Sequence, residues 1–179
     1  MLDLETAKAL AEFKGELLRL DGLTTLDPET AKALGEFKGE SLRLNGLTTL
    51  DPDAAKALAE STAWNGDLEL LTTLDANTAK ALAAAPRWDG RLPRLTALDS
   101  PDSVAIATAL ATRKGPLRLL NLKKISPKTL SALIAKEDVE IPLIETLELI
   151  PEPDGSETDD FVIPKEFEER QRQAKQRAE

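Results

Sequence analysis

Residues 44–66 read LNGLTTLDPDAAKALAESTAWNG and form one unit of a repeat. The unit opens with a leucine at every third position, a pattern that we call the leucine frame. The frame recurs every 24 residues and begins at Leu20, Leu44, Leu68 and Leu92. A fixed period of this length is typical of proteins in which each unit buries its apolar side against the next unit. We therefore expect the first leucines of the frames to line up in one column.

The spacing of the leucines predicts the backbone of the frame. Three residues is too short for one helix face and differs from the alternation of a plain strand. We therefore expect a short strand that turns a corner. Asp21-Gly22 and Asn45-Gly46 are expected to make the bend, because Asn and Gly tolerate positive φ.

A helix is expected after each corner. Asp51-Pro52 predicts its start, because Asp is a good N-cap and proline suits the first helical position. Alanine, leucine and phenylalanine then follow at every third residue of segment 31–37, which keeps them on one helix face. Gly15 and Gly39 are expected to end the helices in the left-handed conformation.

Two units carry tryptophan in place of phenylalanine. Trp64 and Trp88 stand three residues after the position that holds phenylalanine in the earlier units, while Gly66 and Gly90 replace a strand leucine. We expect each indole to fill the volume that the phenylalanine and the leucine give up. The alternative interpretation is a pair of aromatic rings on which a cofactor stacks.

Two further frames keep the pattern with a looser period. They are Leu119 to Ile125, after an insertion at residues 99–104, and Ile141 to Leu147, after a shortened helix. The pattern thus predicts six helices and six strand corners, with an extra strand end at residues 148–150. On the first five frames, from Leu20 to Ile125, the chain resembles the leucine-rich repeat family, and most of all its bacterial BspA-like type.

The resemblance covers about residues 2–150 and implies a fold. That fold is an α/β leucine-rich-repeat-like solenoid of about six repeats, with short parallel strands on one side and helices on the other. Such repeats usually serve protein recognition. The rest of the chain is expected to divide into an acidic linker at residues 151–163 and a charged C-terminal helix at residues 164–179.

The composition argues against several classes of function. The net charge is −9, which disfavours binding to the phosphate backbone of nucleic acids. The chain has no Cys and no His, the usual nucleophile, base and zinc ligands. We therefore expect no enzyme activity, catalytic residue, metal, cofactor or small-molecule substrate. With no membrane-spanning apolar run and no signal peptide in the sequence, we expect a cytoplasmic protein without membrane contact.

One outward strand position, just before each frame, carries a charge in every unit. It can form a stripe that binds an acidic partner or peptide. It can also form a ladder that neutralises itself, with Asp67 between Arg43 and Arg91 and with Glu140 beside Arg118. The candidate partner-binding residues are Arg19, Arg43, Asp67, Arg91, Arg118 and Glu140.

Two local patterns suggest ligands but are interpreted as structural. A threonine column at the corner looks like an ice- or sugar-binding array, yet it decays to lysine and glutamate in the later units, so we expect hydrogen bonds along the stack instead. Its members are Thr24, Thr25, Thr48, Thr49, Thr72, Thr73 and Thr96. Residues 154–160 resemble a calcium loop only faintly, because the glycine and the downstream glutamate are misplaced, so a flexible acidic linker is favoured.

The C-terminal tail carries a small apolar motif before its charged part. The motif consists of Phe161, Val162, Ile163 and Phe167. It can fold back and cover the last repeat, since the ends of repeat stacks need a cap. It can instead dock on another subunit, or the helix can fray in solution.

The first expected helix, Leu4 to Lys14, leaves Leu2, Leu4 and the sides of Leu10 and Phe13 exposed at that end of the stack. The sequence predicts a non-catalytic repeat scaffold that mediates protein–protein interaction through the sheet face or the exposed ends. One alternative is a structural subunit that self-associates or packs into a larger assembly. Another is polyanion or glycan binding along the four arginines of the stripe.

Overall fold

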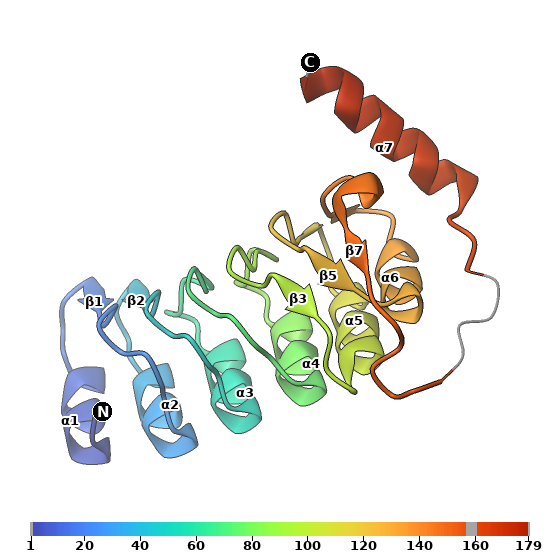
Figure 1. Cartoon of the computed structure of the whole chain (residues 1–179). Coiled ribbons are helices and arrows are strands. Elements are labelled where there is room, and N and C mark those ends of the chain that lie inside the picture. Colours follow the sequence, from blue (N-terminus) through green and yellow to red (C-terminus); the bar gives the residue numbers. More distant parts are fainter. Residues whose placement is uncertain (1, 157–160, 179) are drawn as a thin grey trace.

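The computed structural model describes residues 2–156 and 161–178. This part of the chain is a mixed α/β structure with seven α-helices and short parallel strands in small sheets (Figure 1). The helices are α1 (Leu4–Ala11), α2 (Pro28–Gly35), α3 (Pro52–Glu60), α4 (Ala76–Ala84), α5 (Ser103–Ala111), α6 (Pro127–Ile134) and α7 (Lys165–Ala178), with a 3-10 turn η1 (Ile144–Thr146). Helices α1 to α6 pack in chain order, each against the next.

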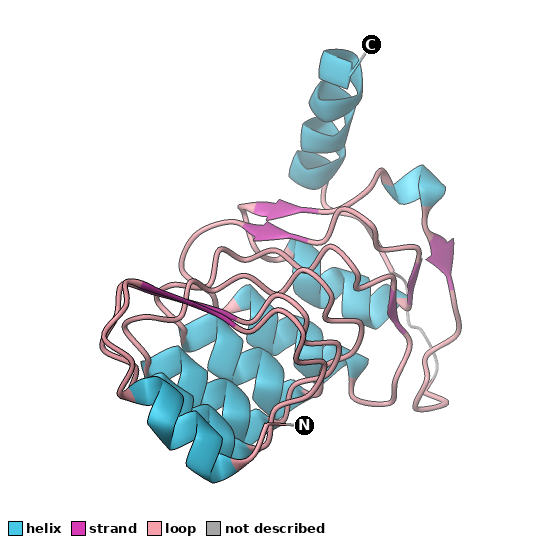
Figure 2. Cartoon of the chain, turned by 90° about the vertical axis from the view of Figure 1, so that its left-hand side faces the viewer, coloured by secondary structure: helices cyan, strands magenta, loops and turns pink. Residues whose placement is uncertain are grey.

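The strands form two groups on either side of each corner. The strands are β1 (Leu17–Arg19), β2 (Ser41–Arg43), β3 (Ala97–Leu98), β4 (Leu117–Arg118), β5 (Lys124–Ile125), β6 (Val139–Glu140) and β7 (Glu148–Leu149). Pairs β1–β2 and β4–β6 lie before the frames, while β3–β5–β7 lies at their ends, and all pairs are parallel. Figure 2 shows helices α1 to α6 gathered on one side, with the strands and loops opposite them.

The predicted helix starts are confirmed. The backbone N–H of Thr30 donates to Asp27 Oδ1 over 2.9 Å, and the N–H of Asp53 donates to Asp51 Oδ1 over the same distance. Asp75 and Ser126 cap α4 and α6 in the same way. Each such cap stabilises the fold by roughly 1 kcal/mol. Helix α5 differs, because Asp102 makes no side-chain capping bond.

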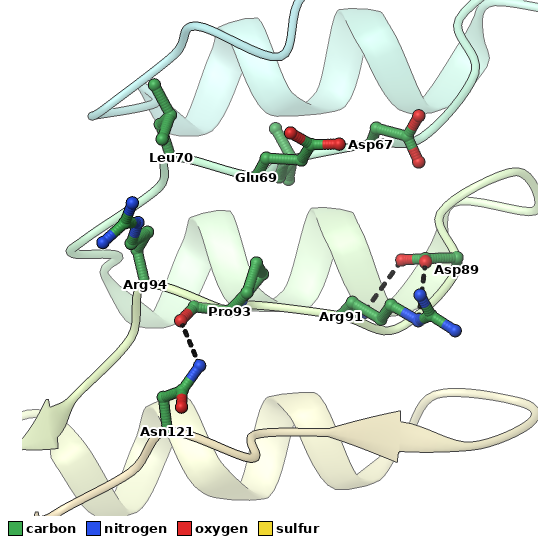
Figure 3. Close-up of a pocket in the computed structure, with 9 residues that line it drawn as sticks. Asp67, Glu69, Leu70, Asp89, Arg91, Pro93, Arg94 and Asn121 are labelled. Atoms are coloured by element: carbon green, nitrogen blue, oxygen red, sulfur yellow. Dashed lines mark hydrogen bonds and ion pairs between the residues drawn. The ribbon is translucent and has the colours of Figure 1, made fainter.

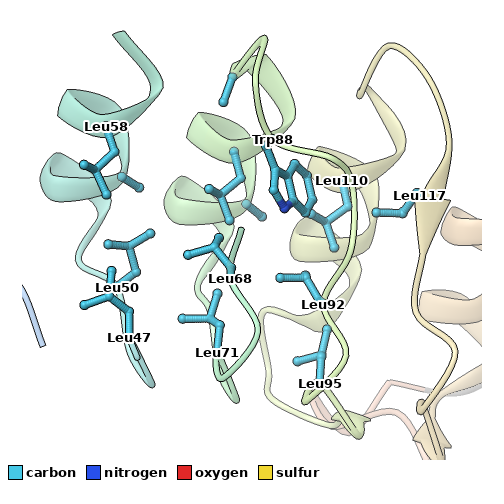
Figure 4. Packing of buried hydrophobic residues seen from close by; sticks show 14 of the residues in the cluster. Leu47, Leu50, Leu58, Leu68, Leu71, Trp88, Leu92, Leu95, Leu110 and Leu117 are labelled. Carbon is cyan, nitrogen blue, oxygen red and sulfur yellow. The ribbon is translucent and has the colours of Figure 1, made fainter. Parts of the chain in front are cut away.

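The frame leucines form the core. Leu44 and Leu92 are fully buried and Leu68 is 2% exposed, while Leu20 in the first unit is half-buried. Figure 4 shows Leu68 and Leu71 of the third frame beside Leu92 and Leu95 of the fourth frame. The helix leucines complete this layer from the other side, since Leu58 and Leu82 are fully buried as their positions in the unit require.

The predicted role of several glycines is wrong. Gly15, Gly39 and Gly46 do not have positive φ, and α1 and α2 end at Ala11 and Gly35. A Cβ atom at Gly46 would overlap the backbone of Asp21 in the preceding unit, and one at Gly39 would overlap the ring of Phe37. These positions need glycine because neighbouring atoms take the space of a side chain.

The tryptophan units contain a turn that the sequence analysis missed. Gly66 and Gly90 have φ of +82° and +79°, the left-handed region that favours glycine. Asn65 Oδ1 accepts from the N–H of Asp67, and Asp89 Oδ1 accepts from the N–H of Arg91 over 2.9 Å. The signal was present, because Asn-Gly and Asp-Gly dipeptides are strong turn formers. Trp64 and Trp88 are both fully buried, which confirms their place in the core and leaves no face for a cofactor.

The threonine column is hydrogen-bonded along the stack, as predicted. The N–H and the hydroxyl of Thr48 both donate to the carbonyl of Thr24, over 2.9 and 3.2 Å. Thr72 donates in the same way to the carbonyl of Thr48. These bonds fix the register of the first three units.

The C-terminal helix lies against the last unit. Phe167 is 2% exposed and belongs to the hydrophobic core cluster. Gln171 Oε1 accepts from the backbone N–H of Ile144 over 3.1 Å, and Lys175 Nζ lies 2.7 Å from Glu145 Oε1. The described helices include none with the length and apolar character needed to cross a bilayer.

Candidate functional site

The hydrogen bonding between units is interrupted once, at the junction of residues 61–75 with residues 85–99, which we call the joint. No backbone hydrogen bond crosses it, and all residues on both sides are described. On the preceding side the N–H of Leu42 donates to the carbonyl of Ala63 over 2.7 Å. On the following side the N–H of Arg118 donates to the carbonyl of Gly90 over 2.7 Å. The joint therefore separates two hydrogen-bonded blocks.

The turns at Gly66 and Gly90 explain the interruption. They direct the N–H groups of Asp67 and Arg91 to the side chains of Asn65 and Asp89 within the same unit. The carbonyl of Arg91 also accepts from the indole Nε1 of Trp88 over 3.4 Å. Backbone groups that pair between units elsewhere are satisfied locally here, so the joint is held by apolar packing of the frame leucines and of α3 on α4.

A hollow of about 470 Å³ opens over the joint on the side away from the helices (Figure 3). Asp67, Glu69 and Leu70 of the third unit form one wall, and Arg91 and Arg94 lie on the fourth unit. Leu68, Asp89, Pro93 and Asn121 complete the lining, and Asn121 Nδ2 donates to the carbonyl of Pro93 over 2.8 Å. The hollow is thus made by residues of three successive units.

A second hollow of about 300 Å³ continues the first. It shares Arg91, Pro93 and Asn121 with the hollow over the joint and extends to Arg118, Leu120 and Glu140. The two together form one depression across the third to sixth units, which we call the strand-side groove. Its lining includes Asp67, Arg91, Arg118 and Glu140, four of the six residues of the predicted stripe.

The remaining two stripe residues lie outside the groove, on β1 and β2. Arg19 Nε is 3.6 Å from Asp21 Oδ2, so this arginine faces a carboxylate of its own unit. The Nε atom of Arg43 is buried and has no hydrogen-bond partner among the described residues. The structure therefore does not bring all six residues to one site.

The predicted charge ladder is correct at one end and wrong at the other. Arg118 Nε lies 3.0 Å from Glu140 Oε1, as expected. Asp67 forms no ion pair with Arg43 or Arg91, because the amide of Asn65 donates to it over 2.6 Å. Arg91 pairs instead with Asp89, at 3.3 Å. The tight turns explain the difference, since they place a partner for each charge two residues away in the sequence.

The groove keeps charges without a partner of opposite sign. Within the described residues, Glu69 and Arg94 form no salt bridge, and both side chains are exposed. Glu69 stands beside Asp67 on the third unit, whereas Arg94 stands on the fourth (Figure 3). One wall of the hollow is acidic, and the opposite wall carries an unneutralised arginine.

Apolar side chains are exposed in the same groove. Leu70 is 38% exposed and Leu120 is 55% exposed, and Pro93 lies between their units. Sequence analysis missed both leucines, because they look like ordinary members of a leucine-rich frame. Their position in the unit is the available signal: the first two units have Gly22 and Gly46 where the third has Leu70.

The tail motif is divided between core and surface. Phe167 is buried, Phe161 and Ile163 are half-buried, and Val162 is 76% exposed. Three of the four residues pack against the hydrophobic core of the chain. The structure thus places the apolar part of the tail on the last unit.

The calcium-loop pattern at residues 154–160 lies partly outside the described residues. Within the described part, Asp154 Oδ1 accepts from the backbone N–H of Ser156 over 2.9 Å, and Lys128 Nζ donates to the Ser156 hydroxyl over 2.7 Å. The hydrogen bonds from Ser156 lower the pKa of Asp154 below its ordinary value. No cluster of three acidic ligands suited to a metal ion occurs in residues 2–156 and 161–178.

The arrangement of the groove suits recognition. It offers carboxylates, a guanidinium and exposed leucines, and these groups bind ligands by charge and apolar contact. Comparison of the chain with known proteins gave no match to a family model, to a curated protein or to a solved structure. The function is therefore argued from the groove.

Proposed function

We propose that this chain is a non-catalytic repeat scaffold that binds a protein partner through the strand-side groove. The observation that carries the proposal is the coincidence of two independent features. The groove contains four of the six charged residues that the sequence pattern singles out, and it exposes Leu70 and Leu120 among them. Large apolar side chains rimmed by charges are typical of protein interaction sites.

We also propose that residues 1–150 form a leucine-rich-repeat-like solenoid. The support is the 24-residue period, the side-by-side packing of α1 to α6, and the hydrogen bonds between equivalent residues such as Thr24 and Thr48. In such a fold each unit contacts only its neighbours, so the strand side forms an extended surface for docking.

A protein partner fits the groove better than a polyanion or a glycan. Arg19, Arg91 and Arg118 each have a carboxylate within 3.6 Å, so the arginines of the stripe are largely neutralised. The chain as a whole carries a net charge of −9, which repels a polyanion. We therefore place polyanion binding behind protein binding.

Site-specific photo-crosslinking in the source cells tests the proposal. A photoreactive amino acid replaces Leu120 in the groove, and in a matched control it replaces Lys80, which is exposed on α4 on the helix side. We expect a discrete protein adduct from position 120 and none of that mass from position 80. The same adducts from both positions, or no adduct from position 120, would contradict the proposal.

Self-association is a second candidate, supported by the first unit. Phe13 is 50% exposed and Leu17 is 43% exposed, beside the half-buried Leu10 and Leu20. Light scattering over a range of concentrations tests this alternative. Self-association is supported if the particle mass grows with protein concentration and the Phe13→Glu variant shows no such growth. A constant monomer mass would rule it out.

A further inference from the structure

We infer that the strand-side groove binds an extended peptide segment that presents a basic, an acidic and an apolar side chain at alternate positions. The inference rests on the proposed function and specifies the chemistry of the partner. It follows from the order in which charged and apolar groups succeed one another along the groove.

The third unit supplies the site for the basic side chain. Asp67 and Glu69 lie next to each other on the wall of the hollow, and no lysine or arginine among the described residues pairs with either of them. Among the residues that the structure describes, the only side-chain hydrogen bond to the Asp67 carboxylate comes from the neutral amide of Asn65, so no positive charge compensates it there. The ammonium or guanidinium group of a basic side chain is therefore the group that this acidic wall attracts.

The fourth unit supplies the site for the acidic side chain. Arg91 is engaged by Asp89 at 3.3 Å, but Arg94 has no carboxylate partner among the described residues. Figure 3 shows Arg94 at the end of the hollow that Leu70 borders, away from Asp89. A carboxylate of the peptide pairs with Arg94 in the fork geometry that guanidinium groups favour.

The fifth unit supplies the apolar site. Leu120 is 55% exposed next to Pro93, and the charges on either side of it are already paired as Arg118 with Glu140. A charged side chain of the partner finds no unpaired opposite charge there, whereas an apolar side chain buries the exposed surface of Leu120.

The three sites lie on successive units, an order that suits an extended chain. Alternate side chains of an extended peptide point the same way and repeat every ~6.6 Å, while neighbouring strands that pair, as the fourth and fifth units do at Arg91 and Arg118, are ~4.8 Å apart. In a peptide that crosses the units obliquely, every second side chain therefore faces the groove, and each of these side chains contacts the next unit along. Both chain directions satisfy this geometry, because the contacts come from side chains.

Fluorescence anisotropy with short synthetic peptides and the full chain tests the inference. The peptides share one composition and contain Lys-x-Glu-x-Leu, the reverse sequence Leu-x-Glu-x-Lys, or the charge-exchanged Glu-x-Lys-x-Leu, with x a small polar residue. We expect at least one of the first two to bind about tenfold more tightly than the charge-exchanged peptide, the effect of two exposed ion pairs.

A charge exchange in the protein provides the matched variant. The double substitution Glu69→Arg and Arg94→Glu is expected to make the charge-exchanged peptide the tighter ligand. The substitution Leu120→Asp is expected to weaken the binding of every peptide. All three residues are exposed, and thermal unfolding checks that the variants keep their fold.

The outcomes separate the inference from the proposed function. An inverted preference supports the inference. If all peptides bind equally and Leu120→Asp abolishes that binding, the proposed order of charges along the groove is overturned. The groove then remains the docking site. Absence of binding by every peptide overturns the inference, and the crosslinking at position 120 then decides the proposed function separately.

Discussion

Glu152 Oε1 accepts a hydrogen bond of 2.8 Å from the backbone N–H of Lys128, which lies 24 residues earlier at the start of α6. The carboxylate belongs to a residue that is only 5% exposed, although sequence analysis assigned it to a flexible linker. A carboxylate at a helix N-terminus is favoured by the helix dipole and satisfies a backbone donor that has no helical partner. This hydrogen bond therefore holds the segment that follows the last frame against the start of α6.

The first prediction concerns this contact. Glu152→Ala should lower the free energy of unfolding by about 1–3 kcal/mol, because a charged hydrogen bond is lost and the partly buried N–H of Lys128 is left without a partner. Glu166→Ala, at an exposed position on α7, is the control and should change it by less than about 0.5 kcal/mol. Urea unfolding measures both variants, and equal stabilities would contradict the role of Glu152.

The second prediction uses two equivalent glycines. Gly46→Ala should destabilise the fold by about 1–3 kcal/mol, because the new Cβ overlaps the backbone of Asp21. At Gly22, one repeat earlier, a Cβ would meet no atom within 4 Å, so Gly22→Ala should stay within about 0.5 kcal/mol of the parent. If thermal unfolding ranks the two variants the other way round, the close approach of successive turns is disproved.

The third prediction concerns the helix layer. Leu82→Ala should cost about 2–5 kcal/mol, because this side chain is fully buried between neighbouring units. Leu120→Ala removes the same atoms from a side chain that is 55% exposed and should cost less than about 1 kcal/mol. Chemical denaturation of the two variants gives the difference, and a cost below about 1 kcal/mol for Leu82→Ala would refute its inward assignment.

The fourth prediction concerns pH. Hydrogen bonds from the side chain and the backbone of Thr30 lower the pKa of Asp27 below its ordinary value. The ionised carboxylate therefore stabilises the fold above the unfolded-state pKa, and this contribution is lost as the pH falls through the folded-state pKa. Asp27→Asn should weaken the acid dependence of the unfolding midpoint. If Asp27→Asn and the parent lose stability in the same way as the pH falls, the stabilising role of the Asp27 carboxylate is disproved.

The fifth prediction concerns the tail. Phe167→Ala should lower the free energy of unfolding by about 3 kcal/mol, because the ring is buried in the core cluster. Val162→Ala, in the same motif but 76% exposed, should have little effect. If both substitutions change the free energy of unfolding by equally small amounts, the alternative is favoured that the motif binds a partner instead of covering the last unit.

The local signals in the sequence predicted the elements well. Asp27 and Asp51 mark helix starts where the structure has them, and the buried Leu44, Leu68 and Leu92 follow from the 24-residue period. These features depend on neighbouring residues or on a strict repeat, so they can be read without three-dimensional information.

The features that the sequence did not reveal depend on contacts between units. The role of Gly46 follows from the position of the Asp21 backbone, and the burial of Glu152 follows from where α6 begins. The ion pair of Arg91 with Asp89, in place of Asp67, follows from a turn whose left-handed glycine was taken for a packing substitution. Four charged residues of the groove were therefore named from the sequence, whereas Glu69, Arg94 and the two exposed leucines were missed.

The interruption at the joint has a mechanical consequence. Bending the chain within either block distorts hydrogen bonds between units, whereas bending it between residues 61–75 and 85–99 shifts only apolar packing, that of the frame leucines and of α3 on α4. The molecule thus has two stiff halves and one compliant point, and its curvature changes there at the lowest cost. A ligand that spans this point rigidifies the molecule as it binds, and slower amide hydrogen exchange on both flanks would record that stiffening.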